Sequence, residues 1–95
     1  MNIDTTAIDQ DPPRIEFPCS YPIKVMGLAR DSFRAEVLAV IERHSDSISE
    51  ERISVRASSR GNYVSITVVI QATGEDQLQR IFADLKKTSS VKMVL

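Results

Sequence analysis

Several features are scarce in this chain of 95 residues, and each scarcity excludes a class of protein. A single cysteine cannot form an intramolecular disulfide, which argues against a disulfide-stabilised secreted domain. No apolar run approaches the roughly 18 residues that a membrane-spanning helix needs. The first residues lack a basic stretch followed by an apolar core, so no secretory signal is predicted. We therefore expect a soluble cytoplasmic protein that has no contact with a membrane.

Catalytic and metal-binding side chains are also few, because Cys19 and His44 are the only cysteine and histidine. Cys19 has no base near it in sequence and is expected to be an inert, partly buried thiol. His44 ends a predicted helix, where an imidazolium interacts favourably with the helix dipole, and it lacks the companions that a zinc site requires. The three glycines are isolated and form no phosphate-binding loop. We predict no enzyme activity, no metal and no cofactor.

The net charge of −1 conceals an uneven distribution along the chain. Residues 1–20 hold four acidic side chains and one basic side chain, whereas the remainder has a basic excess. Pro12 and Pro13 disfavour a helix in the acidic segment, and chain termini stay disordered unless something ties them down. We predict a flexible acidic tail over residues 1–14 and a single domain over residues 15–95.

Hydrophobic periodicity in the rest of the chain predicts four strands and two helices. The alternation typical of half-buried strands covers residues 21–28, 53–58, 63–72 and 91–95. Apolar residues recur at helical spacing over residues 32–44 and 74–87. Two amphipathic helices in the order βαββαβ cover one face of a four-stranded antiparallel sheet. With right-handed crossovers, this order predicts a ferredoxin-like α+β fold with strand order 4-1-3-2.

The second and third predicted strands are joined by a turn that sets their register. Gly61-Asn62 has the composition of a two-residue hairpin loop. Such a loop pairs Ile53 with Ile70 and Val55 with Val68, and it places these apolar side chains on one face. The helices have their own signals, since Thr73-Gly74-Glu75-Asp76 matches a capping box. Asp31 or Ser32 is expected to cap the earlier helix.

The sheet face that no helix covers is assigned by alternation along the strands. Its candidate binding residues are Lys24, Met26, Arg56, Ser65, Thr67 and Lys92. A face with basic side chains and no acidic one suits an anion or nucleic acid, although such residues are also ordinary on a solvated sheet face. Met26 on this face also indicates a partner surface. RNA-binding strands present alternating aromatic rings, and here Tyr63 stands alone, so nucleic acid is an unlikely partner.

The loop between the first strand and the first helix is a second candidate site. It consists of Gly27, Leu28, Ala29 and Arg30. Glycine permits close backbone approach, the helix that follows favours an anion at its N-terminus, and Arg30 could pair with a carboxylate. The simpler interpretation is that Gly27 only ends the strand.

Three segments resemble the YbeD-like family of small uncharacterised bacterial proteins. They are Tyr21–Gly27 (YPIKVMG), Ser58–Ser65 (SSRGNYVS) and Val91–Leu95 (VKMVL). The resemblance spans about residues 17–95. It implies a βαββαβ fold similar to the ACT-type regulatory domains that bind amino acids and control enzymes. The family has no established activity or ligand, so the resemblance assigns no functional residue.

These observations favour a small non-enzymatic domain with a regulatory or protein-interaction role and an unidentified protein partner. The alternative is an ACT-like sensor of an amino acid or carboxylate that uses residues 27–30. RNA binding on the open sheet face is the least favoured hypothesis. The second and fourth strands form the edges of the predicted sheet, and an exposed edge makes a homodimer plausible. A further hypothesis is that the acidic tail shields the basic face.

Overall fold

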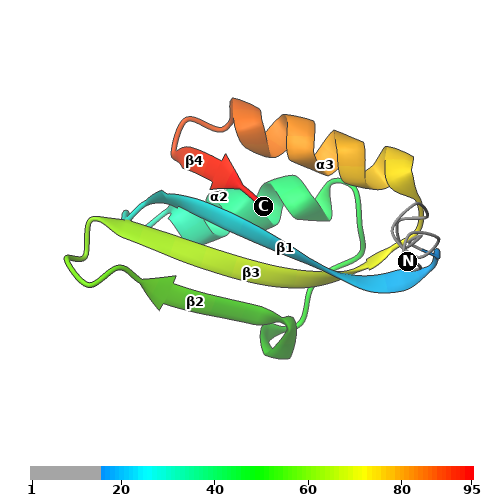
Figure 1. Ribbon diagram of the computed structural model, residues 1–95, viewed down its shortest axis with the longest axis horizontal. Helices are drawn as coiled ribbons and strands as arrows, with labels where there is room; N and C mark the ends of the chain where they lie inside the picture. Colours follow the sequence, from blue (N-terminus) through cyan, green and yellow to red (C-terminus); the bar gives the residue numbers. More distant parts are fainter. Residues whose placement is uncertain (1–15) are drawn as a thin grey trace, which may run out of the picture.

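A computed structural model describes residues 16–95, and the predicted tail of residues 1–14 lies outside the described residues. The elements in chain order are β1 (Cys19–Leu28), α2 (Phe33–Glu42), the 3-10 helix η1 (Glu50–Arg52), β2 (Ile53–Ala57), β3 (Tyr63–Ala72), α3 (Glu75–Lys87) and β4 (Val91–Val94). The strands form one antiparallel sheet in the order β2-β3-β1-β4 (Figure 1). The predicted ferredoxin-like α+β fold and its strand order are confirmed.

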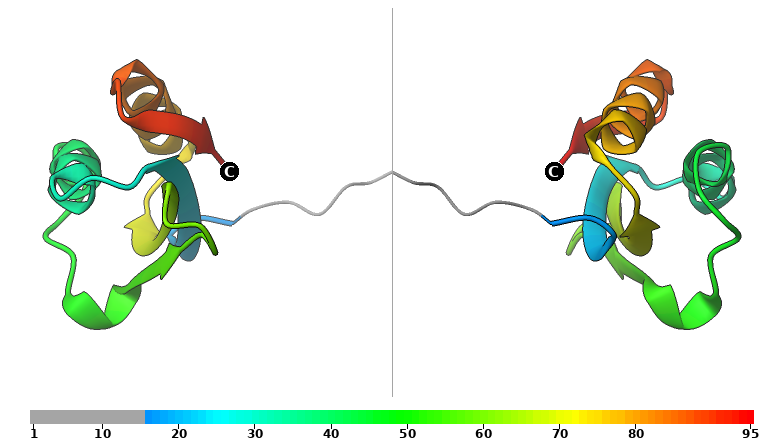
Figure 2. Two further views of the ribbon diagram at one scale, coloured as in Figure 1. Left: turned by 90° about the vertical axis from the view of Figure 1, so that its left-hand side faces the viewer. Right: turned by 90° about the vertical axis from the view of Figure 1, so that its right-hand side faces the viewer.

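Both helices lie on one side of the sheet, and the other side carries no helix (Figure 2). The hydrophobic positions of α2 and α3 recur every three to four residues, so each helix turns one apolar stripe toward the sheet. Alternate residues of β1 and β3 meet these stripes. The core between them consists of Ile23, Val25, Phe33, Val37, Val40, Ile41, Ile66, Val68, Ile70, Ala72, Leu78, Ile81 and Leu85.

The predicted register between β2 and β3 is wrong by two residues. Ile53 lies opposite Val68, and Val55 lies opposite Ile66. The connection is longer than two residues, because the Ser58 N–H still donates to the Tyr63 carbonyl at 2.8 Å. Gly61 takes the left-handed conformation that the longer turn requires, with φ of 76°. A slip of two residues keeps every side chain on its face, so burial could not distinguish the two registers.

The predicted helix caps are also corrected by the structure. Gly74, and not Thr73, is the N-cap of α3, and no side chain caps the helix there. The Thr73 N–H instead donates to the side-chain oxygen of Gln77 at 2.8 Å. Ser32 is the N-cap residue of α2, but its hydroxyl donates to Glu36 at 3.0 Å and does not accept from the first turn. At the start of each helix, the hydrogen-bond acceptor is a side chain one turn into the helix, Gln77 in α3 and Glu36 in α2.

The edge strand β2 lies largely outside the hydrophobic core. Val55 is paired with Ile66 and so points to the covered side, yet its side chain is 53% exposed. The helices make their main contacts with β1, β3 and β4. A strand residue on the helix side of the sheet is therefore buried only where a helix packs against its strand.

Candidate functional site

Two rows of paired residues cross the centre of the open sheet face. The first row is Lys24, Thr67 and Ser54, and the second row is Met26, Ser65 and Arg56. Both rows run from β1 through β3 to β2, because β3 pairs with the two other strands. Alternation along antiparallel strands puts all of these side chains on one face. The register thus brings together all the predicted open-face residues except Lys92.

Two shallow hollows of about 260 and 210 Å³ lie along these rows. Both are lined by Lys24, Arg56 and Ser65, which separate them. We call the first the polar hollow, because its other walls include Ser54 and Thr67. We call the second the apolar hollow, whose other walls include Met26, Ala57, Tyr63 and Val64. The two hollows lie next to each other along the strand direction.

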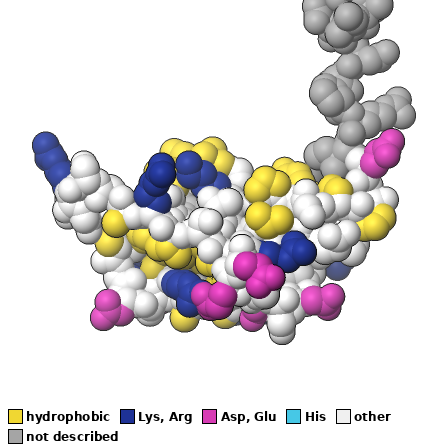
Figure 3. All heavy atoms as spheres, turned by 90° about the horizontal axis from the view of Figure 1, so that it is seen from below, with side chains coloured by type: hydrophobic (Ala, Val, Ile, Leu, Met, Phe, Trp, Pro, Cys, Tyr) yellow, Lys and Arg dark blue, Asp and Glu magenta, His cyan; other side chains and the backbone are white. Residues whose placement is uncertain are grey.

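Lys24 and Arg56 carry the positive charge of this face and have no acidic partner within residues 16–95. The ion pairs of the described residues are Arg34–Glu50 and His44–Asp84. No aspartate or glutamate side chain lines either hollow. In Figure 3, basic side chains lie beside hydrophobic ones toward the upper edge, and most acidic side chains lie toward the lower edge, where basic side chains are interspersed with them.

The strand β4 adds hydrophobic side chains to the open face that sequence reasoning missed. The pairing with β1 shifts between Met26 and Gly27, so that Met93 lies opposite Met26 and Val91 lies opposite Gly27. This bulge leaves Lys92 as the extra, exposed residue, and simple alternation no longer assigns it to a face. Met93 is 50% exposed. Val91 and Val94 both pack against the core although they are three positions apart. A regular strand would bury residues two or four positions apart, so this spacing was the sequence signal for a bulge.

Of the predicted loop, Gly27 and Leu28 belong to β1 and pair with β3, so only Ala29 and Arg30 lie beyond the strand. Hydrogen bonds to two distant turns hold the segment Gly27–Arg30 in place. The Leu28 N–H donates to the Ser90 carbonyl, and the Ala29 N–H donates to the Asn62 carbonyl, each at 3.0 Å. A side chain at Gly27 would collide with the Ser90 carbonyl and with the ring of Phe33. The close approach that this glycine permits is thus made by the chain's own residues.

The same region contains a carboxylate with two hydroxyl donors. Ser90 is fully buried, and its hydroxyl donates to Glu36 at 2.6 Å. Ser32 donates to the other oxygen of Glu36 at 3.0 Å. The hydrogen bond from Ser90, then that from Ser32, with the charge of Arg30 adding to them, lowers the pKa of Glu36 below its ordinary value. This cluster fastens the turn before β4 to α2.

His44 and Cys19 occupy different kinds of surroundings. The His44 ring Nε2 lies 2.7 Å from Asp84 of α3, and this hydrogen bond lowers the pKa of the Asp84 carboxyl. His44 was predicted to end the first helix, but α2 ends at Glu42. The hydrogen-bond partner of the His44 ring is the carboxylate of Asp84 on the neighbouring helix α3. No cluster of three metal-binding side chains exists among the described residues. Cys19 is a free, partly buried thiol at the start of β1.

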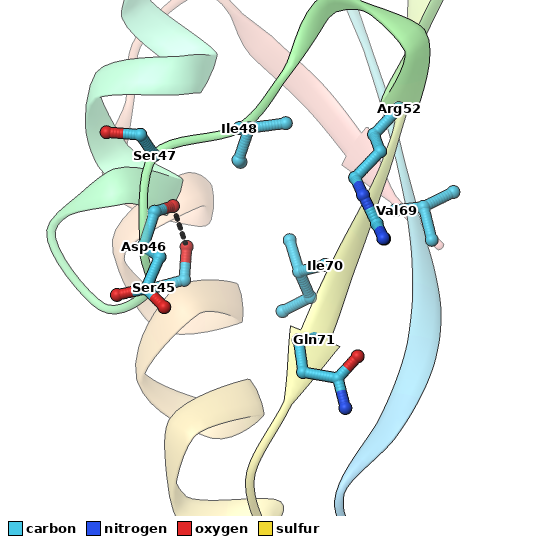
Figure 4. A pocket seen from close by; sticks show the side chains of 8 residues that line it. All are labelled: Ser45, Asp46, Ser47, Ile48, Arg52, Val69, Ile70 and Gln71. Carbon is cyan, nitrogen blue, oxygen red and sulfur yellow. Dashed lines mark hydrogen bonds between the residues drawn. The ribbon is translucent and has the colours of Figure 1, made fainter.

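A third hollow lies where β3 extends past its pairing with β2. The loop after α2 borders one side, and Arg52 reaches down along β3 on the other (Figure 4). Its lining includes Asp46 and Arg52, so side chains of both charges border it. Arg52 belongs to η1. Sequence reasoning assigned no role to residues 45–52, and this hollow was not predicted.

Comparison with known proteins assigns a family. The model of the family described as Protein of unknown function (DUF493) matches residues 12–95. The chain belongs to the DUF493 family. A UPF0250 protein of Pseudomonas aeruginosa is 48% identical over 92 residues, which cover 96% of this chain and 99% of the relative. A UPF0250 protein of Hahella chejuensis is 39% identical over 90 residues, covering 95% and 99%. The YbeD-like resemblance and the bacterial relatives are thereby confirmed.

Solved structures support the fold of this DUF493 chain. The solution structure of protein HP0495 from H. pylori has a TM-score of 0.69 at 19% identity and covers 92% of this chain and 91% of that one. The solution structure of the ACT domain from GTP pyrophosphokinase of Chlorobium tepidum has a TM-score of 0.61 at 19% identity, covering 78% and 80%. At this identity the likeness establishes an ACT-like fold.

The descriptions of the DUF493 family and of the UPF0250 relatives name no function and no enzymatic activity. The chain therefore belongs to a family whose description assigns no function, and it has an ACT-like fold. Within the part of the chain that the structure describes, no helix combines the length and apolar character needed to cross a membrane.

Proposed function

We propose that this chain is a non-enzymatic regulatory or protein-interaction module that binds a partner protein through the open face of its sheet. The observation that carries the proposal is the pair Lys24 and Arg56, which flank Ser65 and have no acidic partner within residues 16–95. Most exposed basic side chains of the described residues lack an acidic partner, and these two differ because they share adjoining hollows with Met26 and Tyr63 that no acidic side chain lines. The ACT-like fold supports a regulatory role by analogy.

Site-specific photocrosslinking in the native cell tests this proposal. A crosslinking amino acid at Ser65 lies between the two hollows, and the same amino acid at the exposed Gln79 of α3 is the matched control. We expect a defined protein adduct from position 65 that is absent from position 79 and is lost with Arg56→Glu. Adducts of equal yield at both positions, or none at position 65, contradict the proposal.

A second candidate function is an ACT-like sensor of an amino acid or carboxylate at Gly27–Arg30. The likeness to an ACT domain favours it, as does the position of Ala29 and Arg30 between β1 and α2. The amides of Leu28 and Ala29 already have acceptors, so the ligand would depend on Arg30. A thermal-shift screen of amino acids and carboxylates tests it, because a ligand of the native state raises the melting temperature. Loss of the shift in Arg30→Ala but not in Arg80→Ala would support it.

Two further partner predictions rank below these. RNA on the open face would need stacking rings, and Tyr63, which lines the apolar hollow, is the one aromatic side chain among the residues that line the two hollows. A homodimer would use an edge of the sheet, and β2 and β4 are the edges. Light scattering of the purified chain over a range of concentrations measures the oligomeric state directly, and a monomeric mass throughout contradicts the homodimer.

A further inference from the structure

The polar hollow has the chemistry of an oxyanion site. Lys24 and Arg56 supply positive charge from two strands, and three hydroxyl groups that can donate to an oxygen atom line the same hollow (Ser54, Ser65 and Thr67). No acidic side chain competes with a ligand there. Because both cations are exposed and lack internal partners, a carboxylate would gain their charge without breaking an existing ion pair.

The apolar hollow adds a place for a hydrophobic side chain next to the oxyanion site. The side chains of Met26 and Tyr63 line it beside the same two cations, and Tyr63 is 48% exposed. The apolar hollow is displaced from the polar hollow by two residues along the strands, because Met26 follows Lys24 by two positions in β1. Two residues of an extended strand span about 6.8 Å. Side chains two positions apart in an extended segment can therefore enter the two hollows together.

The shape of the surface distinguishes an extended segment from other ligands. A small molecule is normally enclosed by its site, whereas these hollows are shallow and lie on an open sheet. A nucleic acid would need more cations and more than one stacking ring. A peptide segment needs only surface contacts for two side chains.

We infer that the two hollows together bind an extended acidic segment of a partner polypeptide. A carboxylate of the segment occupies the polar hollow between Lys24 and Arg56. An apolar side chain two positions away occupies the apolar hollow against Met26 and Tyr63. This inference rests on the proposed function and adds the chemistry of the partner.

Nuclear magnetic resonance titration of the full-length chain with a synthetic peptide tests the inference. The probe contains one glutamate and one leucine two positions apart in a serine- and threonine-rich segment with blocked ends. We expect amide shifts concentrated at Ser54, Ser65 and Thr67. A peptide of the same composition with glutamate and leucine adjacent is the matched control, because adjacent side chains of an extended segment point to opposite sides. Replacing the glutamate by glutamine is the charge control.

Variants of the protein separate the two cations from general charge effects. Lys24→Ala and Arg56→Ala should each weaken binding of the probe about threefold, as expected for exposed ion pairs. Arg80→Ala removes the same charge from the exposed surface of α3 and should leave the affinity unchanged. Raising the salt concentration should weaken binding of the glutamate peptide and not of the glutamine peptide.

The inference is overturned if the glutamine or adjacent-residue peptide binds as well as the probe, or if Arg80→Ala matches Arg56→Ala. It is also overturned if a single-stranded RNA binds the same face more tightly than the probe and is lost with the same variants. Photocrosslinking at Ser65 keeps the two proposals distinguishable. A protein adduct at that position, without binding of the acidic probe, would retain the proposed function and reject the acidic segment.

Discussion

The two faces of the sheet differ in what their residues are paired with. Along β3, Ile66 and Val68 are fully buried beneath the helices, whereas their neighbours Ser65 and Thr67 are half-buried on the other side. Strand residues alternate between faces, so one short segment supplies both the core and the candidate site. Since hydrophobic burial is the main stabilising contribution to a fold, side chains of the open face can change with little effect on stability.

Polar groups on the two sides of the sheet also differ in whether they have a partner among the described residues. The buried hydroxyl of Ser90 donates to Glu36, and that carboxylate also accepts from Ser32. On the open face, Lys24 and Arg56 have no acidic partner within residues 16–95. Pairing is expected where desolvation would otherwise cost free energy, and its absence marks groups that the fold does not require. The comparison of the two faces is therefore open to mutational tests.

The largest effect is expected at Gly27. In Gly27→Ala the new methyl group would collide with the Ser90 carbonyl and the Phe33 ring, so the α3–β4 turn must move. We expect the free energy of unfolding to fall by more than about 3 kcal/mol, measured by urea denaturation. Gly74→Ala is the control, because nothing lies within 4 Å of its added methyl group. Equal stability of the two variants would refute this account of the loop.

Neighbouring residues of β3 provide the next test. Ile66→Ala should lower the free energy of unfolding by about 3 kcal/mol, because it leaves a cavity in the core. Thr67→Ala lies on the open face and should cost less than about 1 kcal/mol, within the range of strand propensity. Denaturant midpoints of the two variants give the comparison. A cost at Thr67 as large as that at Ile66 would show that the open face also contributes to the core.

The Glu36 cluster predicts a dependence of stability on pH. The pKa of Glu36 is lowered in the folded chain, so its ionised form stabilises the fold. This contribution is complete above the ordinary value of 4.5 and is lost as the pH falls through the lower folded value. Glu36→Gln should therefore be less stable than the original chain at pH 7, and the difference should shrink below pH 4.5. A difference that is constant with pH would exclude the ionised carboxylate as its source.

The smallest effect concerns the acidic N-terminal segment. If residues 1–14 compete for the basic face, their deletion should strengthen binding of the acidic probe peptide about twofold, as Debye screening leaves only a modest gain. The same titration on the shortened chain measures this change. Replacing the three aspartates of the segment by asparagine keeps its length and is the control for bulk. An unchanged affinity in both would reject the shielding hypothesis.

The fold could be predicted because its signals are periodic and repeated. The alternation in β3 and the helical spacing in α2 and α3 each specify an element and its buried face. Details that depend on single contacts could not be predicted. The register of β2 differed by two residues because burial is the same in both registers. The cap at Thr73 was misassigned because Gln77, one turn later, supplies the acceptor.

The candidate site was partly accessible from sequence. Alternation assigned Lys24, Arg56, Ser65 and Thr67 to one face, and the register places them together. The contribution of Met93 could not be found in this way, because a bulge in β4 breaks the period of two. The separation of the face into two hollows depends on side-chain shape in three dimensions, which no periodic pattern encodes.

The hydrogen bond between the Ala29 N–H and the Asn62 carbonyl links the two candidate sites. Asn62 belongs to the hairpin turn, and the strands that leave this turn carry Arg56 and Tyr63. This hydrogen bond therefore fixes the position of Ala29 relative to the hairpin turn, so that the backbone before α2 and the strands of the open face share one anchoring point.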